Sequence, residues 1–439
     1  MVAENPAAEI SRSDARREDA LQSAVEAAKI APPKRILIYG INYTPEPIGV
    51  GRFTGELGAF LVQHGTRVAV VTAVPHYPGW LLRDGYRNRY LRETISGASV
   101  IRCPLFLTAE MRGIWRMIAP LSFAVSSAPV AIWRILRFRP DTVLCVEPTL
   151  FSAPAALLAA KLIGARTVLH IQDLEIDAAF AMGHLNGGLL QRAARMFERI
   201  TLKAFDAVVT ISRRMRDKLK EKGIPEDRLS VVRNWVDLKK IRPLDGANPF
   251  RQALQLGHDD FAVLYAGNIG AKQGLEIVLD AAAALQAEPN LVFVIAGDGP
   301  EKARLQKVYC HLKNVRFLPT QPEDKLCELL NLADLHILPQ SRDAADLVLP
   351  SKLGGMLASG RPVLVMADPG TELYSFVEGT ADIVPTGDTK AVCDFILNVS
   401  RLENRQPSLR GRVLAEQLET NKILPEFASI LGAPNYAHA

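Results

Sequence analysis

Residues 39–52 read YGINYTPEPIGVGR and set the architecture of the first half of the chain. The apolar, β-branched run 35–39 precedes this stretch, and an amphipathic helical pattern follows it. A strand that ends in a glycine-bearing loop and opens a helix directs backbone N–H groups and a helix N-terminus at an anion. The stretch differs from the GxGxxG dinucleotide signature, because Gly49 and Gly51 come after two prolines. By itself it fits a phosphate-binding loop and an ordinary strand–helix connection equally well.

Short apolar strands alternate with helical patterns through the first half of the chain. The strands are apolar on both faces, which is typical of a buried parallel sheet. The alternation predicts a doubly wound α/β domain. The strand-like runs are 35–40, 67–73, 99–104, 142–147, 167–171, 207–212 and 230–234.

A turn-rich stretch, 242–249, interrupts the alternation, which then restarts and predicts a second doubly wound domain. Ligands of such sheets bind outside the carboxyl ends of the strands, so we expect a site in a cleft between the two domains. The predicted divisions are a flexible tail (1–33), a first domain (34–240), a linker (241–250), a second domain (251–410), and a C-terminal helix and tail (411–439) for which packing back on the first domain is one arrangement.

The composition is that of a globular protein. The chain has 439 residues, of which 48% are hydrophobic and 23% charged, and its net charge of +5 gives no argument for a nucleic-acid partner. The five cysteines are scattered and form no CxxC pair, which favours reduced thiols and a cytoplasmic location over disulfides or zinc. Residues 1–30 contain no apolar core of a secretory signal.

The region 80–139 combines tryptophans with an excess of arginine. Its central segment, 117–133, carries no charge, but Pro120 and Pro129 argue against a helix that spans a membrane. A cationic, tryptophan-bearing stretch suits the surface of an anionic leaflet, and a buried helix between two strands is a compatible alternative. The arginines are Arg83, Arg87, Arg89, Arg92, Arg102, Arg112, Arg116, Arg134, Arg137 and Arg139, against the acids Asp84, Glu93 and Glu110.

The second domain opens in the same way as the first. A strand at 263–266 leads into GNIGAKQG, residues 267–274, and then into a helix. Within this loop, the glycines at 267, 270 and 274 allow close backbone approach and Lys272 adds a positive charge, so two phosphate-type loops are expected to face each other. The turn Gly297-Asp298-Gly299 follows the next strand, where it either lines a base pocket or simply starts a helix.

Lys352 stands where the helix dipole disfavours a cation. Pro350 breaks the chain, Ser351 is expected to cap the new helix, and Lys352 falls in the first turn. Acids are preferred at that position, so the lysine is understandable if an external anion binds there.

Polar residues also follow two strands of the first domain. Residues 170–177, HIQDLEID, place Asp173 at the cleft; the acids fit a metal site less well than a helix N-terminus. The chain has no DxD triplet, so cationic side chains and helix ends, rather than a metal, are expected to hold a diphosphate. His76 follows the second strand and is either a cleft acid–base group or a plain loop histidine.

Together these stretches resemble the family 4 glycosyltransferases with the GT-B fold, over roughly residues 34–400. The matching parts are the glycine loop and first helix (39–65) and four donor-domain segments, 267–274, 297–300, 335–339 and 350–363. Within the family, the strings GINYTPE, VPHYPGW, GNIG with QGLE, and PSKL are similar to the colanic-acid and exopolysaccharide branch.

The resemblance implies two Rossmann-like domains and a retaining hexosyl transfer from a GDP- or UDP-linked sugar, with no metal and no other cofactor. It implies a polyprenyl-diphosphate-linked saccharide as acceptor, at the inner face of the cytoplasmic membrane. The region 80–139 would then contact that membrane as a peripheral attachment.

The sequence departs from the broad family at four positions. Asn268 and Gln273 stand where arginine and lysine are usual, and Leu347 and Gly355 stand where two glutamates are usual. The missing glutamates normally contact the sugar and the ribose; Asp343 or Asp346 is a candidate replacement for the sugar contact. A degenerate GT-B scaffold protein and a GT-B nucleotide-sugar epimerase are the alternative functions.

The predicted site follows from these observations and from the resemblance. Lys352 is assigned to stabilise the leaving diphosphate, and Asp173 or His76 to orient the acceptor hydroxyl. The predicted donor-binding residues are Gly49, Gly51, Arg52, Gly267, Asn268, Lys272, Gly297, Asp298, Gly299, Ser351 and Lys352.

Overall fold

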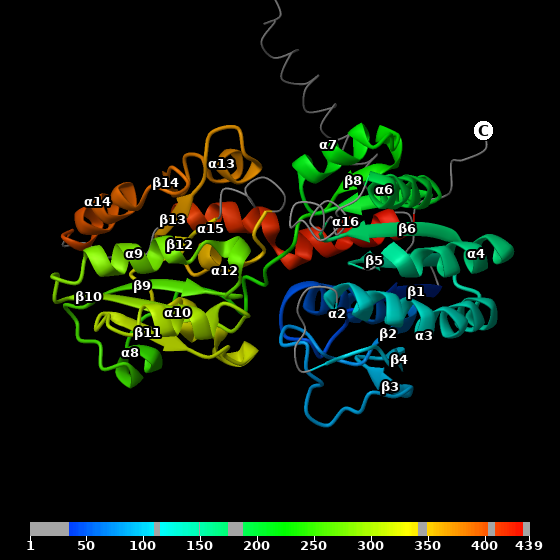
Figure 1. Cartoon of the computed structure of the whole chain (residues 1–439), viewed down its shortest axis with the longest axis horizontal. Helices are drawn as coiled ribbons and strands as arrows, with labels where there is room; N and C mark the ends of the chain where they lie inside the picture. The colour runs from blue at the N-terminus through cyan, green and yellow to red at the C-terminus, as the bar shows by residue number, and fades with distance from the viewer. Residues whose placement is uncertain are drawn as a thin grey trace, which may run out of the picture.

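Two α/β units lie side by side in the structure (Figure 1). It is a computed structural model that describes residues 35–108, 115–148, 150–173, 188–340, 349–402 and 409–432. Each unit is built on its own sheet, and helices cover both faces of each sheet. The predicted fold class, two Rossmann-like domains, is confirmed.

The first sheet has eight strands in the order β3-β4-β2-β1-β5-β6-β7-β8. All neighbours are parallel except β3 and β4. Its strands are β1 (Arg35–Gly40), β2 (Arg67–Ala73), β3 (Leu91–Ile95), β4 (Ala98–Cys103), β5 (Thr142–Glu147), β6 (Arg166–Ile171), β7 (Ala207–Thr210) and β8 (Leu229–Val231).

Alternate side chains of each strand enter two separate cores, as the pleat requires. In β1, Leu37 joins a core formed with α3 and α4, whereas Ile38 joins a core formed with α2 and α16. The helices of this unit are α2 (Gly49–Gln63), α3 (Trp115–Phe138), α4 (Ala153–Ile163), α6 (Gly188–Lys203), α7 (Arg213–Glu221) and α16 (Thr420–Gly432).

The second sheet has six parallel strands in the order β11-β10-β9-β12-β13-β14. These are β9 (Phe261–Ala266), β10 (Leu291–Ala296), β11 (Val315–Leu318), β12 (Leu335–Leu338), β13 (Val363–Met366) and β14 (Asp382–Val384). Its helices are α8 (Pro249–Ala253), α9 (Glu276–Ala284), α10 (Lys302–Val308), α11 (Leu326–Leu330), α12 (Lys352–Ala358), α13 (Glu372–Val377), α14 (Thr389–Ser400) and α15 (Leu409–Ala415).

The chain returns to the first unit at its end. After α15, helix α16 crosses over and packs against α2 and β5 (red in Figure 1). Phe427 is fully buried there, and the Thr142 hydroxyl donates a hydrogen bond of 2.8 Å to the carbonyl of Leu431.

Helix α3 passes the length and hydropathy test for a membrane span over Ile118–Phe138. Its inner face, however, is part of the first core, where Phe123 and Ile135 are completely buried. Leu121, Val125 and Leu136 face outward and are exposed. The helix is therefore a structural layer of the first unit with an apolar outer face.

Candidate active site

A cleft of about 430 Å³ opens between the two units. It lies at the carboxyl ends of the strands, where β1, β6, β9 and β10 each lead into a lining loop, as expected for open α/β sheets. Most of the predicted site residues meet here. Those that line the cleft are Gly49, Arg52, Asp173, Gly267, Asn268, Lys272, Gly297, Asp298, Ser351 and Lys352.

Helix α2 presents its first turn to the cleft. Gly49 begins the helix with a φ of 66°, a conformation that favours glycine. The N-cap residue Ile48 makes no side-chain capping bond, and the first turn contains no acid. The backbone donors there are left for an anionic ligand.

Arg52 is held at the cleft by Glu56, which Trp235 holds in turn. Its Nε donates to Glu56 Oε1 at 2.8 Å, and Glu56 Oε2 accepts from Trp235 Nε1 at 2.6 Å. Trp235 belongs to the segment that joins the two units and also lines the cleft. Sequence reasoning missed Glu56, although its i, i+4 spacing from Arg52 is a recognisable signal.

Lys352 is a partly buried lysine that lines the cleft. Its Nζ donates to the Tyr265 hydroxyl at 2.7 Å, and Tyr265 in turn donates to the Asn268 carbonyl at 2.5 Å. Among the described residues, no carboxylate forms an ion pair with Lys352, and burial lowers the pKa of its ammonium group to about 7. A cation buried in this way gains most from an anionic ligand.

Ser351 does not cap α12. Its backbone is already helical, with φ −59° and ψ −24°, and its side chain makes no capping bond. The predicted cap is wrong because Ser351 lies inside the turn that Pro350 begins, where the Leu353 N–H bonds to the Pro350 carbonyl at 3.0 Å. Ser351 itself still lines the cleft.

Lys272 and Asp173 approach each other across the cleft. Their Nζ and Oδ2 atoms are 3.6 Å apart, and both side chains are nearly half exposed. The residue predicted to bind the diphosphate and the residue predicted to orient the acceptor are therefore direct neighbours.

The glycines of the second unit are explained by close packing of two loops. A Cβ on Gly297 would lie 1.9 Å from the Gly267 carbonyl oxygen, and a Cβ on Gly299 would lie 2.2 Å from the Ile269 carbonyl oxygen. Gly299 does not line the cleft among the described residues. Its role is to let the 297–299 turn support the phosphate-type loop.

Asp298 fastens that turn. It accepts from Lys302 Nζ at 2.6 Å and from the Thr320 backbone N–H at 2.8 Å. Burial opposes ionisation of Asp298, but these hydrogen bonds outweigh it and lower the pKa of the carboxyl group. Lys302 and Thr320 were not singled out from the sequence.

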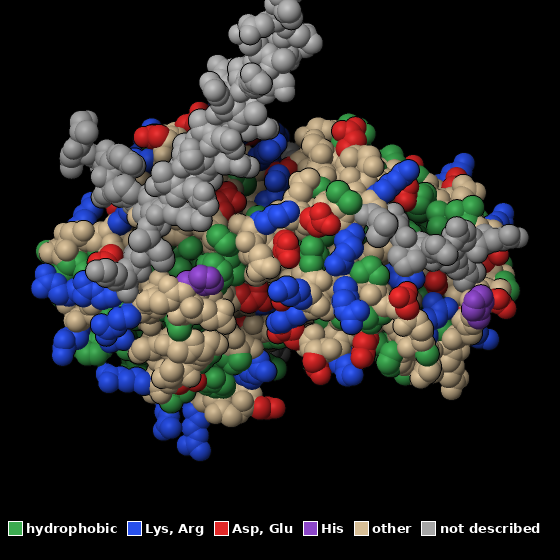
Figure 2. All heavy atoms as spheres, turned by 180° about the vertical axis from the view of Figure 1, so that it is seen from behind, with side chains coloured by type: hydrophobic (Ala, Val, Ile, Leu, Met, Phe, Trp, Pro, Cys, Tyr) green, Lys and Arg blue, Asp and Glu red, His purple; other side chains and the backbone are tan. Residues whose placement is uncertain are grey.

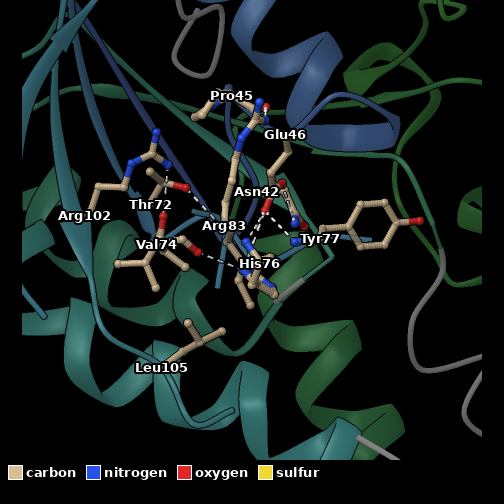
Figure 3. Close-up of polar contacts among 12 residues, drawn as sticks. Asn42, Pro45, Glu46, Thr72, Val74, His76, Tyr77, Arg83, Arg102 and Leu105 are labelled. Atoms are coloured by element: carbon tan, nitrogen blue, oxygen red, sulfur yellow. Dashed lines mark hydrogen bonds and ion pairs between the residues drawn. The ribbon is translucent and has the colours of Figure 1, made fainter. Parts of the chain in front are cut away.

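His76 does not line the cleft among the described residues, which corrects its predicted acceptor-orienting role. It is buried, with Nδ1 2.9 Å from the Val74 carbonyl oxygen and 3.5 Å from Glu46 Oε1. Figure 3 shows His76 between these two residues, with the Tyr77 ring pointing away. The buried ring is therefore not placed to contact a ligand in the cleft.

Glu46 is the residue around which this part of the site is built. Its Oε1 accepts the backbone N–H groups of His76 and Tyr77 at 3.2 and 3.1 Å, and Oε2 accepts from Asn42 at 2.9 Å (Figure 3). Burial raises the pKa of the Glu46 carboxyl group. In the part of the chain that the structure describes, Gly51 does not line the cleft; a Cβ there would lie 2.5 Å from Glu46 Oε2, so this glycine makes room for the carboxylate.

Gln172 lies next to Asp173 in the cleft wall and was not assigned a role from the sequence. It forms a reciprocal amide pair with Asn234, with both N–O distances 3.1 Å. His170 lies beneath it, 3.3 Å away, and burial lowers the pKa of His170 to about 3, so its ring is neutral. This pair gives the cleft wall beside Asp173 neutral hydrogen-bonding groups.

Some residues considered from the sequence lie outside the described residues. They are Glu175, Asp177, Asp343, Asp346 and Leu347. Gly355, which stands in place of the second glutamate, does line the cleft. Within the described ranges, no group of three His, Cys, Asp or Glu residues is arranged to hold a metal ion.

The chain matches two protein-family descriptions. The first is "Glycosyl transferase 4-like domain" over residues 49–235, and the second is "Glycosyl transferases group 1" over residues 247–405. It is 43% identical over 353 residues to WcaI of Escherichia coli (strain K12), a glycosyl transferase named for colanic acid biosynthesis, and the match covers 78% of this chain and 86% of WcaI.

Two solved structures share the fold at low identity. Sucrose-phosphate synthase from Thermosynechococcus elongatus superposes with a TM-score of 0.69 at 15% identity, covering 90% of this chain and 98% of that one. WaaG, a glycosyltransferase involved in lipopolysaccharide biosynthesis, gives a TM-score of 0.66 at 13% identity, covering 91% of this chain and 100% of that one.

Proposed function

The chain belongs to the family 4 glycosyltransferases of the GT-B fold, and from this membership we propose that it transfers a hexosyl residue from a GDP- or UDP-linked sugar. The acceptor is a saccharide carried on a polyprenyl diphosphate, the anomeric configuration is retained, and no metal ion takes part. The pathway class is exopolysaccharide or capsule biosynthesis, which the identity with WcaI supports.

The observation that carries this proposal is the cationic character of the cleft around Lys352. Lys352 is partly buried there without a carboxylate partner among the described residues, while Lys272 and Arg52 line the same space. As the bond between the sugar and the diphosphate stretches, negative charge grows on the diphosphate. Cations that are already in place stabilise that charge more than they stabilise the intact donor.

Asp173 is the proposed partner of the acceptor hydroxyl. In the structure it is paired with Lys272 at 3.6 Å. A diphosphate that neutralises Lys272 competes for this pair and leaves the Asp173 carboxylate to accept a hydrogen bond from the acceptor. Gln172 and Asn234, beside it, supply neutral donors and acceptors for the other sugar hydroxyls.

The proposed location is the cytoplasmic side of the inner membrane, as a peripheral protein. The outer face of α3 supports it, since Leu121, Val125 and Trp133 are exposed there and Arg92 lies against the Trp133 ring near the end of the helix. Such a face suits a lipid surface, and a lipid-linked acceptor is presented at that surface.

A non-catalytic scaffold is the second candidate, and Gly355 favours it. This residue lines the cleft where the family usually has a donor-binding glutamate, so that contact is absent from the described part of the cleft. The two candidates differ in whether a nucleoside diphosphate binds.

A thermal-shift screen of GDP, UDP and other nucleoside diphosphates tests the proposal. A ligand present at 100 times its dissociation constant stabilises the fold by about 2.7 kcal/mol, which gives a readily measured shift. Stabilisation by GDP or UDP is expected, and no stabilisation by any nucleoside diphosphate contradicts the proposal in favour of the scaffold.

Sugar transfer is then measured with the nucleotide sugar whose nucleoside diphosphate binds. Reactions with and without an extract of lipid-linked saccharides are compared, and EDTA is present to remove metal ions. Sugar appearing on the lipid fraction is the expected result. A changed sugar released without an acceptor identifies an epimerase instead, and activity abolished by EDTA contradicts the metal-independent mechanism.

A further inference from the structure

Four arginines gather on the outer surface of the first unit, away from the cleft lining. They are Arg67 at the start of β2, Arg92 in β3, and Arg134 and Arg137 near the end of α3. Arg134 is central: burial, and then the charges of Arg92, Arg137 and Arg67, lower the pKa of its guanidinium group. These like charges repel one another, so the arrangement is electrostatically unfavourable unless an anion binds among the four arginines.

Nothing in the described part of the chain neutralises this cluster. None of the four arginines forms an ion pair with a described carboxylate, and the single polar side-chain contact of Arg134 is a 3.1 Å hydrogen bond from Nη2 to the Ser99 hydroxyl. The Nε atom of Arg134 is buried and has no hydrogen-bond partner. A buried donor without an acceptor is unfavourable, and an anionic oxygen beside Arg134 would satisfy it.

Aromatic rings hold the guanidinium groups in place. The Arg92 guanidinium lies 5.3 Å from the centre of the Trp133 ring, and those of Arg134 and Arg67 lie 5.0 and 6.0 Å from the Phe138 ring. Cation–π contacts at these distances orient the charged groups without neutralising them. Three of the four guanidinium groups, those of Arg67, Arg92 and Arg134, are therefore oriented by aromatic rings.

An apolar groove adjoins the charged cluster. It has a volume of about 560 Å³, lies between β3 and α3, and is lined by Tyr90, Leu91, Arg92, Ile101, Pro129, Val130 and Trp133. Arg92 and Trp133 thus belong to both features. A ligand that fits both has an anionic group next to a hydrocarbon chain.

The surroundings favour a lipid surface as the source of that ligand. Along α3, Leu121, Val125, Trp133 and Leu136 face outward at helical spacing, and Val125 is 76% exposed. Figure 2, which views the molecule from behind, shows many Lys and Arg side chains on the side of the first unit that carries β3 and α3, at the lower left. An apolar helix face bordered by cations lies in the headgroup layer of a membrane.

We propose that Arg67, Arg92, Arg134 and Arg137 bind the phosphate of an anionic lipid headgroup, and that the groove beside Trp133 takes part of the lipid's hydrocarbon chain. This deepens the proposed peripheral location by naming the site that recognises the lipid. It rests on the membrane part of the proposed function and not on the transfer chemistry.

Co-sedimentation of the full chain with vesicles tests the site. Phosphatidylcholine vesicles with and without 30% phosphatidylglycerol are compared for the wild type and for the double variant Arg92→Gln/Arg137→Gln. Each Lys or Arg near an anionic membrane surface contributes to the binding free energy. Removing two of them should therefore weaken binding to the anionic vesicles by about 30-fold. Both residues are exposed, so the variant is expected to fold.

The double variant Arg87→Gln/Arg89→Gln is the matched control. It removes the same charge from exposed positions of the same region, outside the cluster. Equal loss of binding in both double variants shows diffuse attraction and overturns the site, as does wild-type binding that is equally strong to vesicles without phosphatidylglycerol. Thermal shift by a nucleoside diphosphate should be unchanged in the cluster variant, which separates failure of this site from failure of the donor site.

Trp133 gives an independent readout of the groove. Lipids brominated on the acyl chain should quench the tryptophan fluorescence of the wild type, and Trp133→Phe should remove most of that quenching. Quenching that is the same in both proteins contradicts insertion of a lipid chain beside Trp133.

Discussion

Lys352 carries its charge at a cost that depends on pH. Burial lowers its pKa to about 7, so near neutral pH the free protein holds a mixture of charged and neutral lysine. A diphosphate binds the charged form, and binding therefore takes up a proton above this pH. The affinity for the nucleoside diphosphate should fall as the pH rises from about 7 to 9, by at most tenfold per pH unit.

Isothermal titration in buffers of different ionisation enthalpy measures this proton uptake directly. Lys352→Met should flatten the pH dependence and lower turnover by about 10²–10³, in line with loss of one donor to a developing charge. Lys307→Met, which changes an exposed lysine on α10, is the matched control. Near-normal transfer by Lys352→Met contradicts its assigned role.

The lowered pKa of Lys352 also makes the free energy of unfolding depend on pH. Because the folded-state pKa of Lys352 is lower than its unfolded value of 10.5, the unfolded chain binds more protons between about pH 7 and 10.5. Stability linked to this residue therefore rises with pH through that window and is lost below pH 7. Urea unfolding of the wild type at pH 7 and 9 should show this rise, and Lys352→Met should lack it.

Single residues also show where a sequence informs and where it does not. Gly49, Gly267 and Lys352 were recognisable because strand, loop and helix are contiguous in the chain, and topology alone brings such loops to one edge. His76 was placed at the cleft by the same rule, yet its ring turns inward to Val74 and Glu46. That orientation depends on a contact between segments 30 residues apart, which sequence pattern does not reveal.

At the scale of elements, β3 is a strand that the sequence pattern did not predict, and the reason is visible in its residues. β3, LRETI, has apolar residues only at its two ends and lies at the sheet edge, so it lacks the apolar signal of the inner strands. Ser96 and Gly97 connect it to β4 with φ values of 47° and 82°, the conformation of a tight hairpin turn. A polar edge strand is defined by its partner rather than by its own composition.

The loop before α2 is held by Glu46, and this gives a prediction about a whole element. Glu46→Gln keeps the shape but replaces one acceptor oxygen with a donor, so at least one bond with Asn42, His76 or Tyr77 is lost. The loss of one acceptor at a buried position should cost about 1–3 kcal/mol of stability. Urea unfolding measures it, with Glu221→Gln, at an exposed position, as control.

The same variant should also affect function, because Tyr77 and Gly49 line the cleft on either side of this loop. A shifted loop is expected to raise the KM for the acceptor more than the KM for the nucleotide sugar, which the other unit holds. Unchanged stability together with unchanged KM values contradicts the structural role given to Glu46.

At the scale of the whole molecule, contacts of Glu372 hold the two units together in addition to the linker. Glu372 on α13 of the second unit accepts the backbone N–H groups of Arg213 and Arg214, at 2.9 and 2.8 Å, where α7 of the first unit begins. It also pairs with Arg233 at 3.2 Å, and the Arg233 guanidinium lies 4.8 Å from the Phe376 ring centre. One carboxylate thus ties a helix end and the start of the linker to the other unit.

Removing this carboxylate should loosen the approach of the two units without unfolding either one. Hydrogen bonds to a charged group contribute about 1.5–3 kcal/mol each, so Glu372→Ala should shift the molecule toward a more open arrangement. Because the cleft is assembled from both units, kcat/KM is expected to fall by roughly tenfold or more, equivalent to at least about 1.4 kcal/mol. Small-angle scattering should give a larger radius of gyration, which a saturating nucleoside diphosphate partly reverses.

Glu378→Ala, an exposed position just beyond the same helix, should leave both measurements unchanged. A variant at Glu372 with wild-type scattering and wild-type kinetics would mean that the cleft residues and the linker alone hold the two units together.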